Sequence, residues 1–136
     1  LDADRVGARN LRLAEANAPE VLEHLLPAGS VDELWIFFPD PWHKKRHTKR
    51  RLIDGGFPPM VRRALRPGGI VRLATDWDDY ARQMRTVFDG AEGFTRDFAG
   101  EWAERHPGRV LTAFERKGER AGRAIRDLAY RTAGGS

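Results

Sequence analysis

The spacing of apolar residues in the first third of the chain predicts two strands separated by a helix. Apolar and polar residues alternate over residues 10–16, which is typical of a strand with one buried face. A helix is expected after Asn17, because Pro19 suits a first helical turn and the apolar residues of 21–26 have helical spacing. Residues 31–38 then contain a near-continuous apolar run, the pattern of a strand buried on both faces of a sheet.

The rest of the chain continues this alternation of helices and strands. The expected elements are, in chain order, a short helix at residues 52–53, a helix over 57–65, a turn over 66–69, a strand over 70–74, a helix over 77–88, and strands over 94–98, 109–116 and 125–130. This order indicates an α/β fold with a mostly parallel sheet and right-handed crossovers. We therefore expect one domain over residues 1–136, with helices on both faces of the sheet.

Polar side chains follow three of the predicted strands at their carboxyl ends. They are Asn17, Asp40 and Asp76. In α/β sheets, ligands bind just beyond the carboxyl ends of the strands. The agreement of all three positions indicates a ligand site at this edge of the sheet.

The composition limits the class of protein. The chain has 136 residues, of which 40% are hydrophobic and 32% charged, and this fits a single soluble domain. It has no cysteine, which excludes disulfides, zinc–cysteine sites and thiol catalysis. Its apolar runs are shorter than the ~20 residues that span a bilayer, and no secretory leader opens it, so we expect a cytoplasmic protein. The four histidines have no metal-ligand spacing, and we expect no metal site.

Basic residues concentrate in one segment. Residues 41–72 carry 10 basic residues and 1 acidic residue, and residues 43–51 alone hold six lysines and arginines. Such a cluster is typical of a phosphate-binding surface. The candidate phosphate contacts are Lys45, Arg46, Lys49 and Arg50, with Arg120 from a second cationic segment near the C-terminus. A solvated basic loop without a partner is the alternative.

The turn Pro39-Asp40-Pro41-Trp42 is the most distinctive motif. Two prolines restrict the backbone around Asp40, and the neighbouring aromatic residues offer flat faces to a base. A carboxylate held there can accept hydrogen bonds from a nucleobase edge and offset positive charge on its ring. Alternatively, Asp40 caps a stiff loop beside a core tryptophan. Thr75-Asp76-Trp77 repeats the order of carboxylate and aromatic ring, and its Thr75 or Asp76 can equally be a helix N-cap.

Three blocks of residues stand in order along the chain. They are Phe37-Phe38-Pro39-Asp40-Pro41-Trp42-His43-Lys44-Lys45-Arg46-His47 with Lys49-Arg50-Arg51, then Thr75-Asp76-Trp77 with Tyr80-Ala81 and Met84, then Thr112-x-Phe114-Glu115-x-Lys117-Gly118-x-Arg120-x-Gly122 with Asp127-Leu128. In these blocks the chain closely resembles the bacterial tRNA (guanine-N7-)-methyltransferases. The resemblance spans about residues 10–131.

This resemblance implies a Rossmann-like class I methyltransferase fold. It implies methyl transfer from S-adenosylmethionine to N7 of a guanine in the tRNA variable loop, with S-adenosylhomocysteine as product. Asp40 would be the catalytic residue beside the methyl donor, and Asn17 would hold the adenine of the cofactor, where the family usually has an aspartate. The tRNA contacts that the resemblance implies are Lys44, Asp76, Thr112 and Glu115.

The chain departs from the family's pattern at its beginning. The glycine-rich turn and the acidic strand end that bind the methionine and ribose of the cofactor have no counterpart in residues 1–17. We therefore expect the C-terminal portion of a methyltransferase domain, incomplete at the N-terminus and inactive if the missing strands are indispensable. A non-catalytic RNA-binding domain is the main alternative, and methylation of a small molecule or a protein is a weaker one. The sequence leaves monomer and homodimer open.

Overall fold

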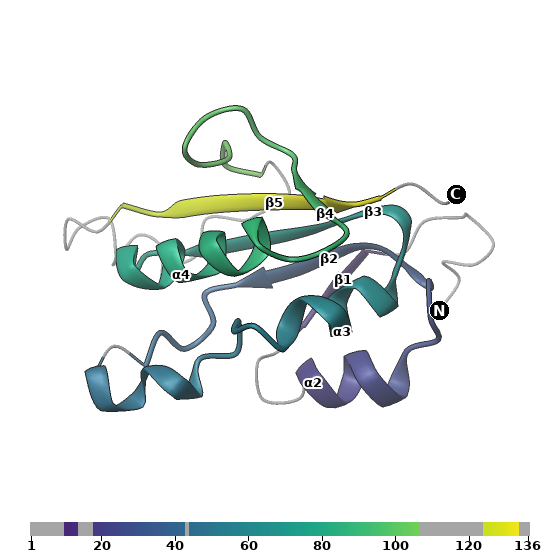
Figure 1. Ribbon diagram of the computed structural model, residues 1–136, viewed down its shortest axis with the longest axis horizontal. Helices are drawn as coiled ribbons and strands as arrows, with labels where there is room; N and C mark the ends of the chain where they lie inside the picture. The colour runs from purple at the N-terminus through teal and green to yellow at the C-terminus, as the bar shows by residue number, and fades with distance from the viewer. Residues whose placement is uncertain (1–9, 14–17, 43, 107–123, 134–136) are drawn as a thin grey trace.

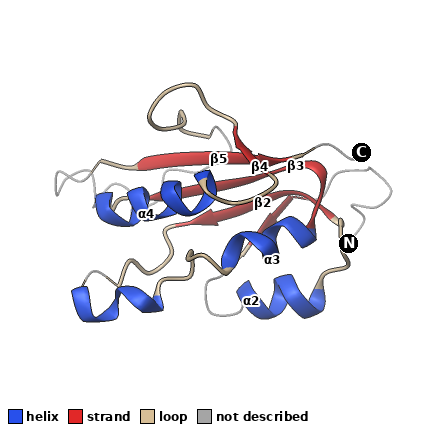
Figure 2. Cartoon of the chain, in the orientation of Figure 1, coloured by secondary structure: helices blue, strands red, loops and turns tan. Residues whose placement is uncertain are grey.

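In the computed structural model, five strands form a single sheet, with helices packed along it (Figures 1 and 2). The structure describes residues 10–13, 18–42, 44–106 and 124–133. The strands are β1 (Asn10–Arg12), β2 (Val31–Phe37), β3 (Leu65–Thr75), β4 (Phe94–Arg96) and β5 (Arg126–Thr132), and they lie in the order β1-β2-β3-β5-β4. The expected strand over 109–116 lies outside the described residues.

The sheet is mixed. Strands β1, β2 and β3 pair in parallel, as the sequence predicts, with Leu34 of β2 opposite Val71 of β3. Strand β5 lies between β3 and β4 and is antiparallel to both. Because β4 is antiparallel to β5, it runs in the same direction as β1, β2 and β3. Of the five described strands only β5 is reversed, so the expectation of a mostly parallel sheet is confirmed.

Three of the four expected helices lie where the sequence predicts them, and the fourth does not. The helices are α2 (Ala18–Glu20), which continues into the π-helical turn η2 (Val21–Leu25), then the 3-10 helix η3 (Lys45–Arg50), α3 (Phe57–Ala64) and α4 (Asp78–Asp89). The short helix expected at residues 52–53 is wrong, since the basic segment itself is helical instead. The Tyr80 hydroxyl accepts a hydrogen bond from the Ile53 N–H, and the Gln83 amide donates to the Ile53 carbonyl. These bonds satisfy the Ile53 backbone without a helix.

The expected turn at residues 66–69 is also wrong, because the structure includes this segment in β3. The pairing of β3 with β2 shifts register between Val31 and Glu33, and Gly68 has a φ of 80°. A positive φ suits glycine, which has no Cβ to clash. The residues expected to form a turn thus make an irregular start to the strand.

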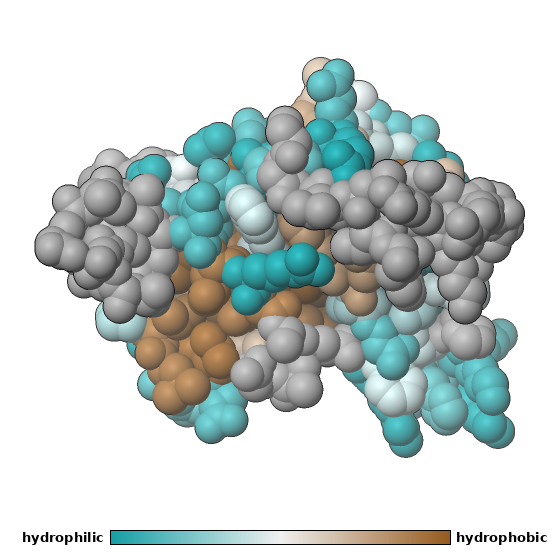
Figure 3. All heavy atoms as spheres, turned by 180° about the vertical axis from the view of Figure 1, so that it is seen from behind, coloured by the Kyte–Doolittle hydropathy of each residue, from teal (hydrophilic) through white to brown (hydrophobic). Residues whose placement is uncertain are grey.

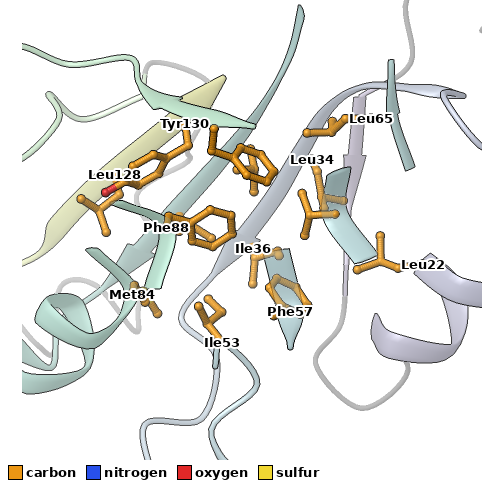
Figure 4. Packing of buried hydrophobic residues seen from close by; sticks show 14 of the residues in the cluster. Leu22, Leu34, Ile36, Ile53, Phe57, Leu65, Met84, Phe88, Leu128 and Tyr130 are labelled. Atoms are coloured by element: carbon orange, nitrogen blue, oxygen red, sulfur yellow. The ribbon is translucent and has the colours of Figure 1, made fainter. Parts of the chain in front are cut away.

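The hydrophobic core lies between the sheet and the helices (Figure 4). Alternate residues of the strands point to one face, among them Leu34 and Ile36 of β2 and Tyr130 of β5. Helical residues such as Phe57 and Phe88 pack onto the same face. Within the described residues, the helices that contribute to this core are η2, α3 and α4, and they form one layer, whereas the sequence predicts helices on both faces.

The opposite face of the sheet carries aromatic and charged side chains. Trp35 donates a hydrogen bond to Glu33 at 3.0 Å, and Arg72 donates to the same carboxylate oxygen at 2.9 Å. The ring of His106 stands edge-on to Trp35 at 5.0 Å between centroids, so the loop after β4 reaches this face. Figure 3 shows an open hydrophobic area on this side of the molecule.

Asp89, at the end of α4, ties that helix to β4 and β5. Its carboxylate accepts hydrogen bonds from the Arg96 guanidinium at 2.8 and 2.5 Å and from the Tyr130 hydroxyl at 2.7 Å. The bonds from Arg96 are the main reason that the pKa of Asp89 is lowered, and Tyr130 adds to them against the opposing effect of burial. Because the folded pKa is the lower one, this stabilisation is present above the unfolded pKa and is lost as the pH falls through the folded pKa.

We expect Asp89→Asn to lower the free energy of unfolding at pH 7 by on the order of 1 kcal/mol, because an amide accepts weaker hydrogen bonds than a carboxylate. The deficit should shrink as the pH falls below about 4, where the unfolded carboxyl takes up its proton. Urea unfolding at pH 7 and pH 3 measures both values. Asp97→Asn, which removes a partly exposed partner of Arg131, is the control and should change little. A deficit of equal size at both pH values would contradict the prediction.

Candidate functional site

The turn after β2 and the turn after β3 lie at the same edge of the sheet. Phe37 pairs with Ala74 in the parallel ladder, and the Phe38 N–H continues the pairing with a 2.8 Å hydrogen bond to the Ala74 carbonyl. Asp40 and Asp76 therefore follow neighbouring strands at their carboxyl ends, as the sequence predicts. The third expected position, Asn17, lies outside the described residues.

The backbone of the turn that carries Asp40 is sharply constrained. The Asp40 carboxylate accepts a hydrogen bond from the Trp42 N–H at 2.9 Å. Phe38 and Trp42, on either side, have φ values of 55° and 41°. Bulky residues rarely adopt positive φ, and each such residue costs on the order of 1–3 kcal/mol. Strain of this kind is typical of functional turns that the surrounding structure holds in place.

Two hollows open beside Asp40. One, of about 490 Å³, is lined mainly by apolar groups at the carboxyl ends of β1 and β2, including Leu13, Ile36 and Phe38, together with Arg12. The other, of about 200 Å³, is lined by side chains that follow Asp40 in the chain, namely Trp42, Lys44 and His47. Asp40 is exposed and lines both hollows. Its carboxylate can therefore contact a ligand in either one.

The basic segment forms a cationic surface next to the smaller hollow. Lys44 and the four described candidate phosphate contacts, Lys45, Arg46, Lys49 and Arg50, are all exposed. The Arg50 guanidinium lies over the Trp42 ring at 5.2 Å, and His47 stands edge-on to that ring at 5.9 Å. The Trp42 ring is thus held between a guanidinium group and an imidazole ring next to this surface.

Asp76 is much less accessible than the sequence suggests. Its exposed fraction is 5%, and its contact with tRNA stays a prediction. The expected N-cap is wrong by one or two positions, since α4 begins at Asp78 and Trp77 occupies the cap position. The Thr75 hydroxyl instead accepts a 3.3 Å hydrogen bond from the Trp77 N–H and turns the chain into the helix.

Three further candidates lie outside the described residues. They are Thr112, Glu115 and Arg120, which belong to the third sequence block. Their proposed contacts with tRNA stay predictions.

Arg51 is a site residue that the sequence does not reveal. By composition it is one cation of the basic segment, but its exposed fraction is only 4%. Its guanidinium bonds to the Pro41 carbonyl, to Gln83 and to Asp79. Nothing in the local sequence distinguishes this buried arginine from its exposed neighbour Arg50.

Other features of the described residues do not point to a second site. A hollow of about 720 Å³ lies between α3 and the end of α4, lined by residues such as Pro58, Arg62 and Val87, away from the carboxyl edge of the parallel strands. No three His, Asp or Glu side chains of the described chain are grouped so as to hold a metal ion. Among the described helices, none is long and apolar enough to cross a membrane.

Comparisons with known proteins agree on one family. The family model described as "Putative methyltransferase" matches residues 2–128. The chain is 41% identical to a tRNA (guanine-N(7)-)-methyltransferase of Arthrobacter sp. (strain FB24), over 90% of this chain and 53% of that protein. It is 45% identical to the protein of the same name from Aeromonas hydrophila subsp. hydrophila, over 95% and 55%.

The chain thus spans about half the length of the curated relatives it matches. The crystal structure of the aminoglycoside resistance methyltransferase NpmB1 aligns with 78% of this chain and 54% of its own, at 16% identity and a TM-score of 0.41. That likeness is too distant to support an assignment.

Proposed function

This chain belongs to the tRNA (guanine-N7-)-methyltransferase family, and on that basis we propose that it carries the site for methyl transfer from S-adenosylmethionine to N7 of a guanine in the tRNA variable loop. The observation that carries the proposal is the position of Asp40 between two hollows. One hollow suits the cofactor and the other suits the base that receives the methyl group. A tRNA substrate also fits the cytoplasmic location that we propose.

The larger hollow fits part of a nucleoside cofactor. Its volume of about 490 Å³ lies within the usual range for small-molecule sites, and its lining is mainly apolar and aromatic. Leu13, Ile36 and Phe38 would pack against the cofactor, while Asp40 would face its positive charge. When bound, S-adenosylmethionine supplies an activated methyl group.

For this methyl transfer the protein must supply the orientation of the reactants and a stabilising negative charge. Guanine N7 has an in-plane lone pair at neutral pH, so no general base is needed. The protein must hold that nitrogen in line with the methyl group, which is catalysis by orientation. Positive charge passes to the purine as the methyl group moves, and the Asp40 carboxylate stabilises this charge because it is already in place.

The exposed cations of η3 would hold the tRNA backbone. They lie on the same side as the smaller hollow, to which Lys44 and His47 contribute. Phosphate contacts of this kind give affinity and orientation without reading sequence. Recognition of the guanine would rest on the shape of the loop and on a base that is splayed out of it.

Binding of S-adenosylhomocysteine to the isotope-labelled chain tests this proposal against the alternative of a non-catalytic RNA-binding domain. We expect the nucleoside to shift the NMR signals of residues that line the larger hollow, such as Leu13, Phe38 and Asp40. Signals around Pro58 and Val87, in the hollow between α3 and α4, serve as the internal control and should not move. A chain that binds tRNA but shows no shift at the larger hollow would favour the RNA-binding alternative.

A further inference from the structure

We propose that Arg51 is a positioning residue that holds the Asp40 carboxylate in place through the Pro41–Trp42 peptide group. The proposal rests on the proposed function for its catalytic consequence, but its geometric part stands on the contacts of the described residues. It assigns to Arg51 a role different from that of the exposed cations beside it.

One peptide group links the two side chains. The N–H of Trp42 donates to the Asp40 carboxylate at 2.9 Å, and the carbonyl of Pro41, at the other end of the same peptide, accepts from the Arg51 Nε at 2.5 Å. A peptide group is planar and rigid. Fixing its carbonyl therefore also fixes the direction of its N–H, and with it the oxygen that Asp40 presents to the hollows.

Arg51 is itself anchored to α4. Its two terminal nitrogens donate to the Gln83 side-chain oxygen and to the Asp79 carboxylate, both at 2.8 Å. Its guanidinium also lies over the Tyr80 ring at 4.7 Å. The Asp40 turn is thus tied, through one buried side chain, to the helix that begins just after Asp76.

The hydrogen bond from Arg51 holds a turn whose backbone is strained. Phe38 and Trp42 hold positive φ values that the chain would leave if it were free to relax. Such conformations persist only where the surroundings determine them, and Arg51 bonds directly to the peptide that precedes Trp42. A lysine cannot replace it, because its ammonium group lacks the planar fork that reaches three acceptors in fixed directions.

The burial of Arg51 separates this role from phosphate binding. With 4% of its surface exposed, it cannot meet a phosphate as Lys45, Arg46 or Lys49 can. Loss of Arg51 should therefore lower the rate of methyl transfer without changing the tRNA affinity. A phosphate contact would show the opposite pattern.

Arg51→Met and Arg51→Lys test the proposal in the whole chain. In both variants we expect the Trp42 amide to exchange with solvent at least about tenfold faster than in the parent, while the amides in the middle of α3 keep their rates. Gln83→Met, which leaves the Arg51 charge in place but removes one of its acceptors, should give a smaller change in the same direction. Where methyl transfer is measurable, kcat should fall at least tenfold, with the KM for tRNA unchanged within twofold.

Arg63→Met is the matched control, because Arg63 also holds backbone carbonyls, those of Leu22 and Leu26, far from the Asp40 turn. It should leave the Trp42 amide unchanged. Unchanged Trp42 exchange in both Arg51 variants, or equal acceleration of all amides as in a general loss of stability, would overturn the proposal. Faster Trp42 exchange in a chain whose parent transfers no methyl group would support the positioning link and count against the proposed function alone.

Discussion

Replacement of Asp40 by asparagine is expected to slow methyl transfer about 10²–10³-fold, the usual effect of removing one preorganised electrostatic group from an active site. Asparagine keeps the side-chain oxygen that accepts the hydrogen bond from the Trp42 N–H, so the turn should keep its conformation. What is lost is the negative charge that stabilises the developing cation on the purine. Initial rates with labelled S-adenosylmethionine and unmodified tRNA measure the change.

The chain offers a close control for this substitution. Asp54 is also exposed, and its carboxylate accepts a hydrogen bond from the Gly56 N–H, two residues on, at 2.9 Å. Asp54→Asn removes one negative charge from the same kind of turn outside the site, and it should leave the rate unchanged. The tRNA affinity of Asp40→Asn should stay within about twofold of the parent, because Asp40 contributes charge rather than a backbone contact. Equal losses of rate and tRNA affinity would refute this division of roles.

Removal of three cations from η3 should weaken tRNA binding by roughly 10–100-fold near 0.1 M salt. The variant combines Lys45→Ala, Arg46→Ala and Lys49→Ala, all at exposed positions. The Thr48 hydroxyl donates to the backbone carbonyl of Lys45, so that bond does not depend on the Lys45 side chain. Each phosphate contact contributes to the dependence of affinity on salt, so the slope of log K against log salt should become shallower by about 2 to 3. Filter binding at several salt concentrations measures both quantities.

A second variant that loses the same number of positive charges tests whether tRNA binds specifically to η3 or is attracted by the net charge of the chain. Arg62, Arg66 and Arg131 are exposed and lie on α3 and near the amino end of β3, away from Asp40. Their joint replacement by alanine also removes three positive charges. The slope of log K against log salt should then change by less than half of the change expected for the η3 variant. If both triple variants lose affinity equally, the basic segment holds no defined tRNA site.

The sequence was most informative where pattern and chemistry coincide. The buried run of β2 and the polar residues at the strand ends predict the sheet edge on which the structure places Asp40 and Asp76. These predictions succeed because strand periodicity and the rule for ligand sites depend on local sequence and topology alone. The exposed cations of η3 are a similar case, since charge runs rarely lie inside a protein.

The features that the sequence does not predict depend on contacts between residues far apart in the chain. The Ile53 backbone is satisfied by Tyr80 and Gln83, and Arg51 is buried by partners some 30 residues further along the chain. Asp76 is buried to 5% exposure, and its contact with tRNA stays a prediction. The antiparallel entry of β5 likewise depends on how the chain returns after α4, which no local pattern encodes.

The position of the transferred methyl group tests the proposed function most directly. The chain is incubated with labelled S-adenosylmethionine and unmodified tRNA, and the labelled nucleotide is located by digestion and mass spectrometry. We expect N7-methylguanosine at a single variable-loop position, with the yield falling 10²–10³-fold in Asp40→Asn and unchanged in Asp54→Asn. Label on another atom or nucleotide, or tRNA binding without any binding of S-adenosylmethionine, would contradict it.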